Sequence, residues 1–160
     1  MKFRLIFIFI GCLAIPLILG AIAGYATSQN IAGWYNQLDK PAFNPPNSLF
    51  APVWTILYVL MGISAFLIWK RPRSQHRRAA LILYAIQLML NFLWSFIFFY
   101  FKLPAAALVE IVMLLTTVIF WMYTTYKVHR TAALIQIPYV LWLCFATALN
   151  AAIVWLNTNP

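Results

Sequence analysis

The stretch WYNQLDKPAFNPPNSLFAPVWTILYVLMGISAFLIW, residues 34–69, decides the fold of this chain. Its first part contains Pro41, Pro45 and Pro46. Proline has no backbone N–H and pushes the residue before it toward extended geometry, so we expect residues 34–49 to form a shaped loop rather than a helix. The second part is an uninterrupted apolar run that is long enough to cross a bilayer as a helix. An aromatic, proline-rich loop therefore leads directly into a membrane helix.

The composition of the whole chain is typical of an integral membrane protein. Of its 160 residues, 65% are hydrophobic and 8% are charged, whereas a soluble domain carries about 25% charged residues. The formal net charge is +9, because Asp39 and Glu110 are the only acidic residues. The Lys and Arg residues lie between apolar runs, where they orient a membrane protein, so we expect the lipid bilayer and no nucleic acid as a partner.

Five apolar runs have the length of a membrane span. They cover about residues 5–26, 51–69, 79–101, 104–126 and 132–156, and a proline-rich lid loop covers residues 27–50. The first run could instead be a signal peptide, but its length favours a span. The sequence therefore predicts an all-α fold, an integral membrane bundle of five transmembrane helices in a single domain, residues 1–160.

The Lys and Arg residues are distributed unevenly over the two ends of this bundle. The amino terminus and the connections after the second and fourth runs carry two, five and two of them, while the first and third connections carry one each. The positive-inside rule therefore predicts a cytoplasmic amino terminus, and a bacterial plasma membrane is favoured. The basic segment 70–78 is either a solvated turn that anchors helix ends, which we favour, or a site for anionic lipid.

Polar and aromatic residues recur at helical spacing on three of the predicted helices. These are Trp54, Tyr58 and Met61 on the second, Gln87, Asn91, Trp94 and Ser95 on the third, and Trp142, Ala146 and Asn150 on the fifth. From spacing alone, such faces either pack helix against helix or line an apolar pocket for a flat hydrophobic ligand.

No residue pattern typical of conventional catalysis occurs. There is no paired carboxylate, no nucleophile beside a base, no glycine-rich phosphate loop and no histidine at metal-ligand spacing, so we expect neither metal nor cofactor. Cys12 and Cys144 lie in apolar runs and are interpreted as packing residues. Glu110 lies about 10 Å from the membrane edge by helical rise. It either belongs to a proton pathway or pairs with Lys102 or a loop cation.

Two blocks of the sequence carry a specific pattern of residues. The first contains Trp34-Tyr35, Leu38-x-Lys40-Pro41, Pro45-Pro46, Pro52-x-Trp54-x-x-Leu57-Tyr58-x-x-Met61-Gly62 and Trp69-Lys70. The second is Pro138-Tyr139-x-x-Trp142-x-x-Phe145-Ala146-Thr147-x-Leu149-Asn150. In this order they closely resemble the translocator protein family, also called tryptophan-rich sensory proteins or peripheral benzodiazepine receptors. The resemblance covers nearly the whole chain.

The resemblance implies a five-helix membrane bundle, commonly a homodimer, with a ligand pocket closed by the first loop. Family members bind porphyrins, sterols, and benzodiazepine or isoquinoline-carboxamide drugs. The ligand-binding candidates in this chain are Tyr35, Trp54, Tyr58, Asn91, Trp94, Trp142 and Ala146. Trp54 and Trp142 also match the tryptophans on which the family's proposed light-driven breakdown of porphyrin depends, and they are the candidate redox residues.

The residues after Asn150 favour a tetrapyrrole over a sterol as the ligand. Animal relatives carry a Leu-to-Tyr-to-Arg sterol segment there, whereas this chain continues AAIVWLN. We therefore expect binding of porphyrin-type tetrapyrroles in their transport, sensing or disposal. The alternatives are light-dependent oxidative degradation of protoporphyrin IX and a ligand-responsive membrane scaffold. A homodimer is expected, with Gly20 and Gly24 as a candidate contact.

Overall fold

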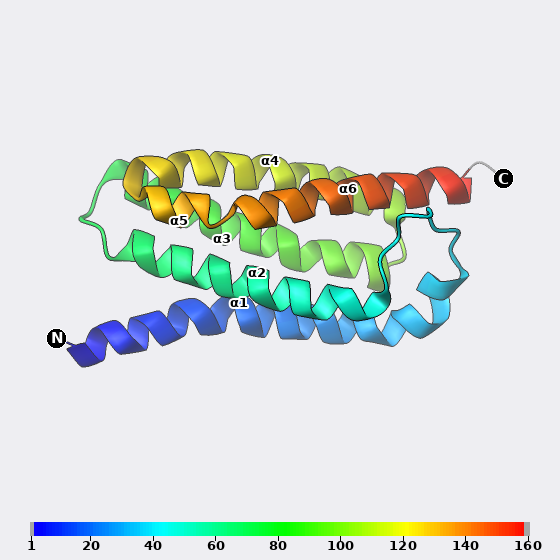
Figure 1. Ribbon diagram of the computed structural model, residues 1–160, viewed down its shortest axis with the longest axis horizontal. Helices are drawn as coiled ribbons and strands as arrows, with labels where there is room; N and C mark the ends of the chain where they lie inside the picture. The colour runs from blue at the N-terminus through cyan, green and yellow to red at the C-terminus, as the bar shows by residue number, and fades with distance from the viewer. Residues whose placement is uncertain (1, 159–160) are drawn as a thin grey trace.

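The computed structural model describes residues 2–158, which fold into a bundle of helices (Figure 1). The helices are α1 (Lys2–Asn30), α2 (Asn47–Trp69), α3 (Gln75–Ser95), α4 (Pro104–Val128), α5 (Arg130–Leu134) and α6 (Ile137–Thr158). Two short π-helices, η1 (Ile31–Tyr35) and η2 (Phe96–Tyr100), continue α1 and α3. Within the described residues, 5 helical segments are long and apolar enough to cross a membrane. The predicted all-α bundle of five transmembrane helices is therefore confirmed.

The long helices run alternately in opposite directions, so the bundle has two distinct ends (Figure 1). The loop end holds the α1–α2 loop, the connection between η2 and α4, and the carboxyl end of α6. The basic end holds the start of α1, the connection between α2 and α3, and the turn between α4 and α5. Each end therefore gathers connections that are far apart in the sequence.

The α1–α2 loop is shorter than the sequence suggests. Trp34 and Tyr35 were expected in the loop, but they belong to η1, because the first proline of the loop follows only at residue 41. At the other side, α2 begins at Asn47, directly after the extended Pro46. Within the connection between α1 and α2, only residues 38–46 lack helical structure.

The last predicted span is interrupted near its start. α5 ends at Leu134, and α6 begins at Ile137. Pro138, in the first turn of α6, has no N–H, and in a continuous helix its ring would clash with the carbonyl of Leu134. The backbone N–H of Gln136 instead donates to the carbonyl of Ala133 at 3.0 Å. A proline at this position therefore divides one predicted helix into two.

Helices α1 and α2 approach each other closely at two glycines. A Cβ atom on Gly62 would lie 2.7 Å from the carbonyl oxygen of Cys12, and one on Gly20 would lie 2.2 Å from Cε2 of Tyr58. Only a hydrogen fits at either position. The close approach that Gly20 permits is therefore to α2 of the same chain. Gly24 has open space around its Cβ direction instead.

Candidate functional site

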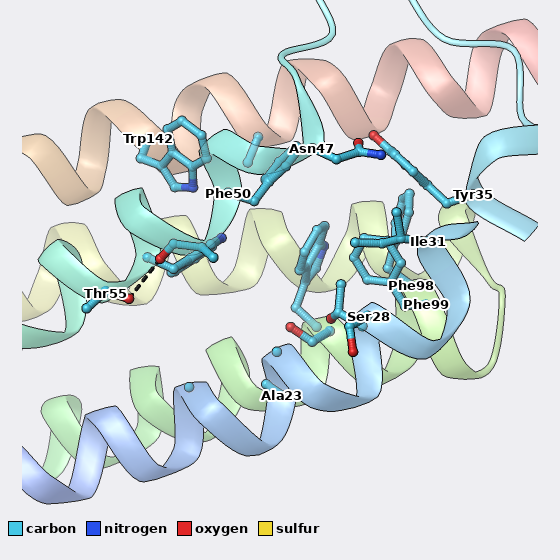
Figure 2. Close-up of a pocket in the computed structure, with 18 of the residues that line it drawn as sticks. Ala23, Ser28, Ile31, Tyr35, Asn47, Phe50, Thr55, Phe98, Phe99 and Trp142 are labelled. Atoms are coloured by element: carbon cyan, nitrogen blue, oxygen red, sulfur yellow. Dashed lines mark hydrogen bonds between the residues drawn. The ribbon is translucent and has the colours of Figure 1, made fainter. Parts of the chain in front are cut away.

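A cavity of about 480 Å³ opens in the half of the bundle nearest the loop end (Figure 2). It lies between α1, η1, α2, the junction of α3 with η2, and α6. Figure 2 shows Trp142 and Phe50 on one side of the cavity and Ala23 and Ser28 of α1 on the opposite side. A volume of this size is typical of a site for a small organic ligand.

Aromatic rings form the wall of the cavity that α2 and α6 provide. Trp54 stacks on Tyr58 with ring centroids 5.6 Å apart, and it meets Trp142 edge to face at 6.5 Å. Trp142 in turn contacts Phe50 at 6.0 Å and Phe145 at 5.4 Å. These contacts hold each ring in place through its neighbours. The result is an apolar wall in which neighbouring rings fix one another's orientation.

The facing wall, from α1, is built of small residues. They recur at helical spacing on one face of this helix, and they are Gly20, Ala21, Ala23, Gly24, Thr27 and Ser28. Because these side chains occupy little volume, the gap between α1 and the aromatic wall stays open. The cavity therefore has the shape of a slot between a small-residue face and an aromatic face.

The polar side chains that line the cavity are uncharged, and two of them are joined in a hydrogen-bonded chain. The indole N–H of Trp94 donates to Oδ1 of Asn150 at 3.3 Å, and Nδ2 of Asn150 donates to the carbonyl of Pro104 at 2.9 Å. By contrast, Nε1 of Trp142 has no hydrogen-bond partner among the described residues. This N–H is buried in the wall, so it does not present a donor to the open cavity.

Tyr35 connects the α1–α2 loop to the cavity. Its ring is buried against Phe98 and Phe99, with centroid distances of 6.1 and 5.5 Å. Its hydroxyl donates to Oδ1 of Asn44, within the loop, at 2.9 Å. Burial raises the pKa of Tyr35 to about 12, so the hydroxyl keeps its proton at neutral pH. The Nζ atom of Lys40 lies 5.0 Å from the centroid of the same ring.

A buried hydrogen-bonded network lies behind the aromatic wall. Tyr58 donates to Oδ1 of Asn91 at 2.6 Å, Asn91 donates to the hydroxyl of Tyr139 at 3.1 Å, and Tyr139 donates to Oε1 of Gln87 at 3.0 Å. The network joins α2, α3 and α6. Each of these polar groups would cost free energy if it were buried without a partner. The network therefore fixes the orientation of Tyr58 in the cavity wall.

Most of the residues expected at the site do line the cavity. They are Tyr35, Trp54, Tyr58, Trp94, Trp142 and Ala146. Asn91 is different, because Tyr58 stands between it and the cavity, so it supports the wall rather than forming it.

Sequence reasoning missed several aromatic lining residues and the whole contribution of α1. The missed aromatic residues are Phe50, Phe98, Phe99 and Phe145. Phe98 and Phe99 lie in η2, whose π-helical turn departs from regular α-helical spacing. A face of small residues at helical spacing was the available signal for α1.

Glu110 lies outside the cavity, on α4. Its side chain is 8% exposed, and neither carboxylate oxygen has a hydrogen-bond partner in the described part of the chain. The alternative in which Glu110 pairs with Lys102 or a loop cation is therefore not observed among the described residues. Residues 2–158 also contain no group of three or more His, Cys, Asp or Glu side chains that could hold a metal ion.

Comparison with known proteins gives matches over almost the whole chain. The profile of the TspO/MBR family matches residues 12–156. The tryptophan-rich protein TspO of Archaeoglobus fulgidus is 41% identical over 141 residues, which cover 88% of this chain and 91% of the relative. The translocator protein of Sus scrofa is 36% identical over 140 residues, 81% of this chain and 80% of the relative. The tryptophan-rich sensory protein of Cereibacter sphaeroides is 36% identical over 126 residues, which cover 79% of this chain and 78% of the relative.

Proposed function

Because the chain belongs to the TspO/MBR family, we propose that its cavity binds a porphyrin-type tetrapyrrole and that the protein acts in tetrapyrrole transport, sensing or disposal. The proposal rests on one observation, the slot between the small-residue face of α1 and the rings of Trp54 and Trp142. A flat aromatic ligand stacks on such rings and loses its contact with water at the same time. The scarcity of charged residues in the lining favours a hydrophobic ligand.

A further feature that supports this proposal is the position of Tyr35. At the loop end, Tyr35 lines the cavity and is hydrogen-bonded to Asn44, so residues 38–46 are suited to act as a lid. Benzodiazepine and isoquinoline-type drugs are also flat and apolar, and they should compete with the porphyrin for this slot.

The proposal is tested by placing a side chain in the slot. Gly24→Leu adds an isobutyl group to the α1 face of the cavity, where a Cβ meets no atom within 4 Å. Binding of protoporphyrin IX, measured from the shift of its Soret absorption band, should weaken by at least about tenfold, because the ligand and the added group overlap.

Gly11→Leu is the matched control for this experiment. Gly11 lies on the same helix and also has open space around its Cβ direction, but it does not line the cavity. This variant should bind protoporphyrin IX as the unmodified protein does. Equal affinities of both variants for the porphyrin would contradict the proposal, since the ligand would then sit elsewhere.

A second function, light-dependent oxidative degradation of protoporphyrin IX, is favoured by the position of two tryptophans. Trp54 and Trp142 both line the cavity, and their rings lie 6.5 Å apart. A porphyrin in the slot would therefore contact two indoles, which can donate electrons to an excited porphyrin. Simple binding needs only the bulk of these side chains, whereas degradation needs their oxidisable rings.

Conservative substitutions separate the two functions. Trp54→Phe and Trp142→Phe keep an aromatic ring but remove the indole, and Trp155→Phe is the control because Trp155 is 70% exposed and does not line the cavity. If the protein degrades porphyrin in light, Trp54→Phe and Trp142→Phe should still bind porphyrin but no longer bleach it. Trp155→Phe should still bind porphyrin and still bleach it. Unchanged bleaching in all three variants would exclude these two tryptophans as electron donors.

A further inference from the structure

A second concave surface lies at the basic end of the bundle, far from the cavity. It is formed where the α2–α3 connection enters α3, and its lining residues are Arg73, Ser74, Gln75, Arg77, Arg78, Leu81 and Ile82. We call it the arginine groove. None of its residues lines the cavity described above. The arginine groove is therefore a surface separate from the cavity.

The arginine groove has an excess of positive charge. Arg73, Arg77 and Arg78 line it. The only acidic residues of the chain are Asp39, in the α1–α2 loop, and Glu110, in the first half of α4, which is the half nearer the loop end. The first turn of α3 adds to this charge, since the amino end of a helix carries a partial positive charge. Neither acidic side chain is therefore placed to neutralise the groove.

Arg77 is held in a fixed position but lacks an acceptor. Its guanidinium carbon lies 5.9 Å from the ring centroid of Trp69, a cation–π contact that connects α3 to the end of α2. Its Nε atom is buried and has no hydrogen-bond partner in the part of the chain that the structure describes. Because the Nε atom has no exposed surface, Arg77 acts on the groove through the positive charge of its guanidinium group, which attracts an anion.

The groove continues into an apolar surface inside the predicted membrane span. Leu81 and Ile82 follow the arginines on α3, and the span runs from residue 75 to residue 100. Ile82 is 49% exposed. A free inorganic anion would gain nothing from these side chains, whereas an acyl chain would cover them.

We propose that the arginine groove binds an anionic phospholipid of the surrounding membrane. Its phosphate group lies against Arg73, Arg77 and Arg78, and one acyl chain follows Leu81 and Ile82. The alternation of charge with apolar surface along α3 matches the order of a phospholipid, from headgroup to tail. This site is independent of the tetrapyrrole proposal, because the two surfaces share no residue.

The test compares two double variants that remove the same charge from the same end of the bundle. Arg73→Gln/Arg78→Gln changes the groove, and Lys127→Gln/Arg130→Gln changes the α4–α5 turn, which does not line it. All four side chains are exposed, so folding should be retained. The measurement is native mass spectrometry of the purified protein with phosphatidylglycerol or phosphatidylcholine, which counts the bound lipids.

The unmodified protein should retain phosphatidylglycerol in preference to phosphatidylcholine. The groove variant should lose affinity for phosphatidylglycerol by on the order of tenfold, while the turn variant changes little. Equal losses in both variants would show a diffuse attraction and overturn the groove. If the unmodified protein showed no preference for phosphatidylglycerol over phosphatidylcholine, the proposed lipid site would also be overturned.

A third arm separates a lipid site from a simple anion site. Inorganic phosphate at millimolar concentration should not displace phosphatidylglycerol, because it makes no contact with Leu81 and Ile82. Displacement by phosphate would overturn the assignment to a lipid. Ile82→Asn should weaken the retention of phosphatidylglycerol, and unchanged retention in this variant would also overturn the proposed path of the acyl chain. Thermal unfolding of each variant confirms that it is folded.

Discussion

At the scale of single residues, the contact between Gly20 and Tyr58 sets the width of the cavity. Tyr58 lies in the cavity wall, and its hydroxyl is fixed by Asn91. Gly20 allows α1 to pass directly over the Tyr58 ring, while Gly24, one turn further, faces open space. Two glycines at neighbouring turns of one helix therefore have different roles. One permits helix packing, and the other leaves room in the slot.

The first prediction concerns Gly20→Ala. The new Cβ would lie 2.2 Å from Cε2 of Tyr58, so either the ring or α1 must shift. Such overpacking should lower the free energy of unfolding by about 1–3 kcal/mol, measured by thermal unfolding in detergent. Gly24→Ala should not lower it, because its Cβ meets nothing within 4 Å and alanine is the better helix former. Equal stability of the two variants would contradict the assigned contact.

The sequence predicted those site residues that stand out chemically. Trp54, Tyr58 and Trp142 are aromatic residues at helical spacing, so their shared faces were visible without a structure. The role of Asn91 could not be predicted in this way, because a buried amide can either contact a ligand or support a neighbouring side chain. The small residues of α1 do recur at helical spacing, but such a face is equally typical of helix packing, and only the structure shows that they border a cavity.

At the scale of elements, the α1–α2 loop is fastened to the end of α6. The side chain of Asn157 accepts from the backbone N–H of Asp39 at 3.1 Å and donates to its carbonyl at 2.9 Å. A single side chain thus pairs with both backbone groups of one loop residue. This pairing holds the loop against the carboxyl end of α6, at the mouth of the predicted ligand site.

The second prediction is that Asn157→Ala speeds the release of bound protoporphyrin IX. Two hydrogen bonds that hold the loop are lost, so the release rate in a stopped-flow experiment should rise on the order of fivefold. Thr158→Ala is the control, because the hydroxyl of Thr158 bonds only to the carbonyl of Val154 in its own helix. An unchanged release rate in Asn157→Ala would mean that the loop does not act as a lid.

The third prediction concerns the start of α5 and its dependence on pH. Nδ1 of His129 accepts from the backbone N–H of Ala132 at 3.4 Å, which caps this helix. Burial, and then the positive charges of Arg71 and Lys70, lower the pKa of His129. The folded protein therefore binds fewer protons at this site than the unfolded protein, and its stability falls as the pH drops below the ordinary histidine value of about 6.5.

The measurement is the thermal unfolding temperature between neutral and mildly acidic pH. His129→Asn keeps a capping acceptor but cannot be protonated, so its unfolding temperature should fall less on acidification. His76→Asn, at an exposed position, should behave like the unmodified protein. If His129→Asn retained the full pH dependence, another group would be responsible for it.

The number of membrane spans followed from hydropathy, but the ends of the helices and the break within the last span did not. Length and apolar character suffice to recognise a span, because the bilayer requires both. The break between α5 and α6 depends on how Pro138 is accommodated. Of the two π-helical turns, η2 occurs inside a predicted helix and η1 inside the predicted loop, and no residue marks either of them. Helix ends are set by local backbone packing, which hydropathy does not record.

At the scale of the whole molecule, the two ends of the bundle differ in charge. The basic end carries Lys70, Arg71 and the arginine groove, whereas the cavity lies in the half of the bundle next to the α1–α2 loop. Figure 1 shows that the α2–α3 connection and the α1–α2 loop lie at opposite ends. The fourth prediction is that the basic end faces the cytoplasm when the protein is produced in a bacterium, as the positive-inside rule requires.

Cysteine labelling tests this orientation in a background in which Cys12 and Cys144 are replaced. Gln37→Cys, near the loop, should react with a membrane-impermeant maleimide in intact cells. His76→Cys, at the basic end, should react only after the membrane is opened. Both positions are exposed, so the difference reports the membrane side alone. The reverse pattern of labelling would show the opposite orientation.

The quenching of tryptophan fluorescence by protoporphyrin IX tests the central claim, a flat ligand in the slot, most directly. Ala146→Leu fills the slot from α6, whereas Ala148→Leu adds the same volume to an exposed position of the same helix. We predict saturable quenching with micromolar or tighter affinity, about tenfold weaker in Ala146→Leu and unchanged in Ala148→Leu. Quenching that does not saturate, or that is the same in all three proteins, would contradict the account.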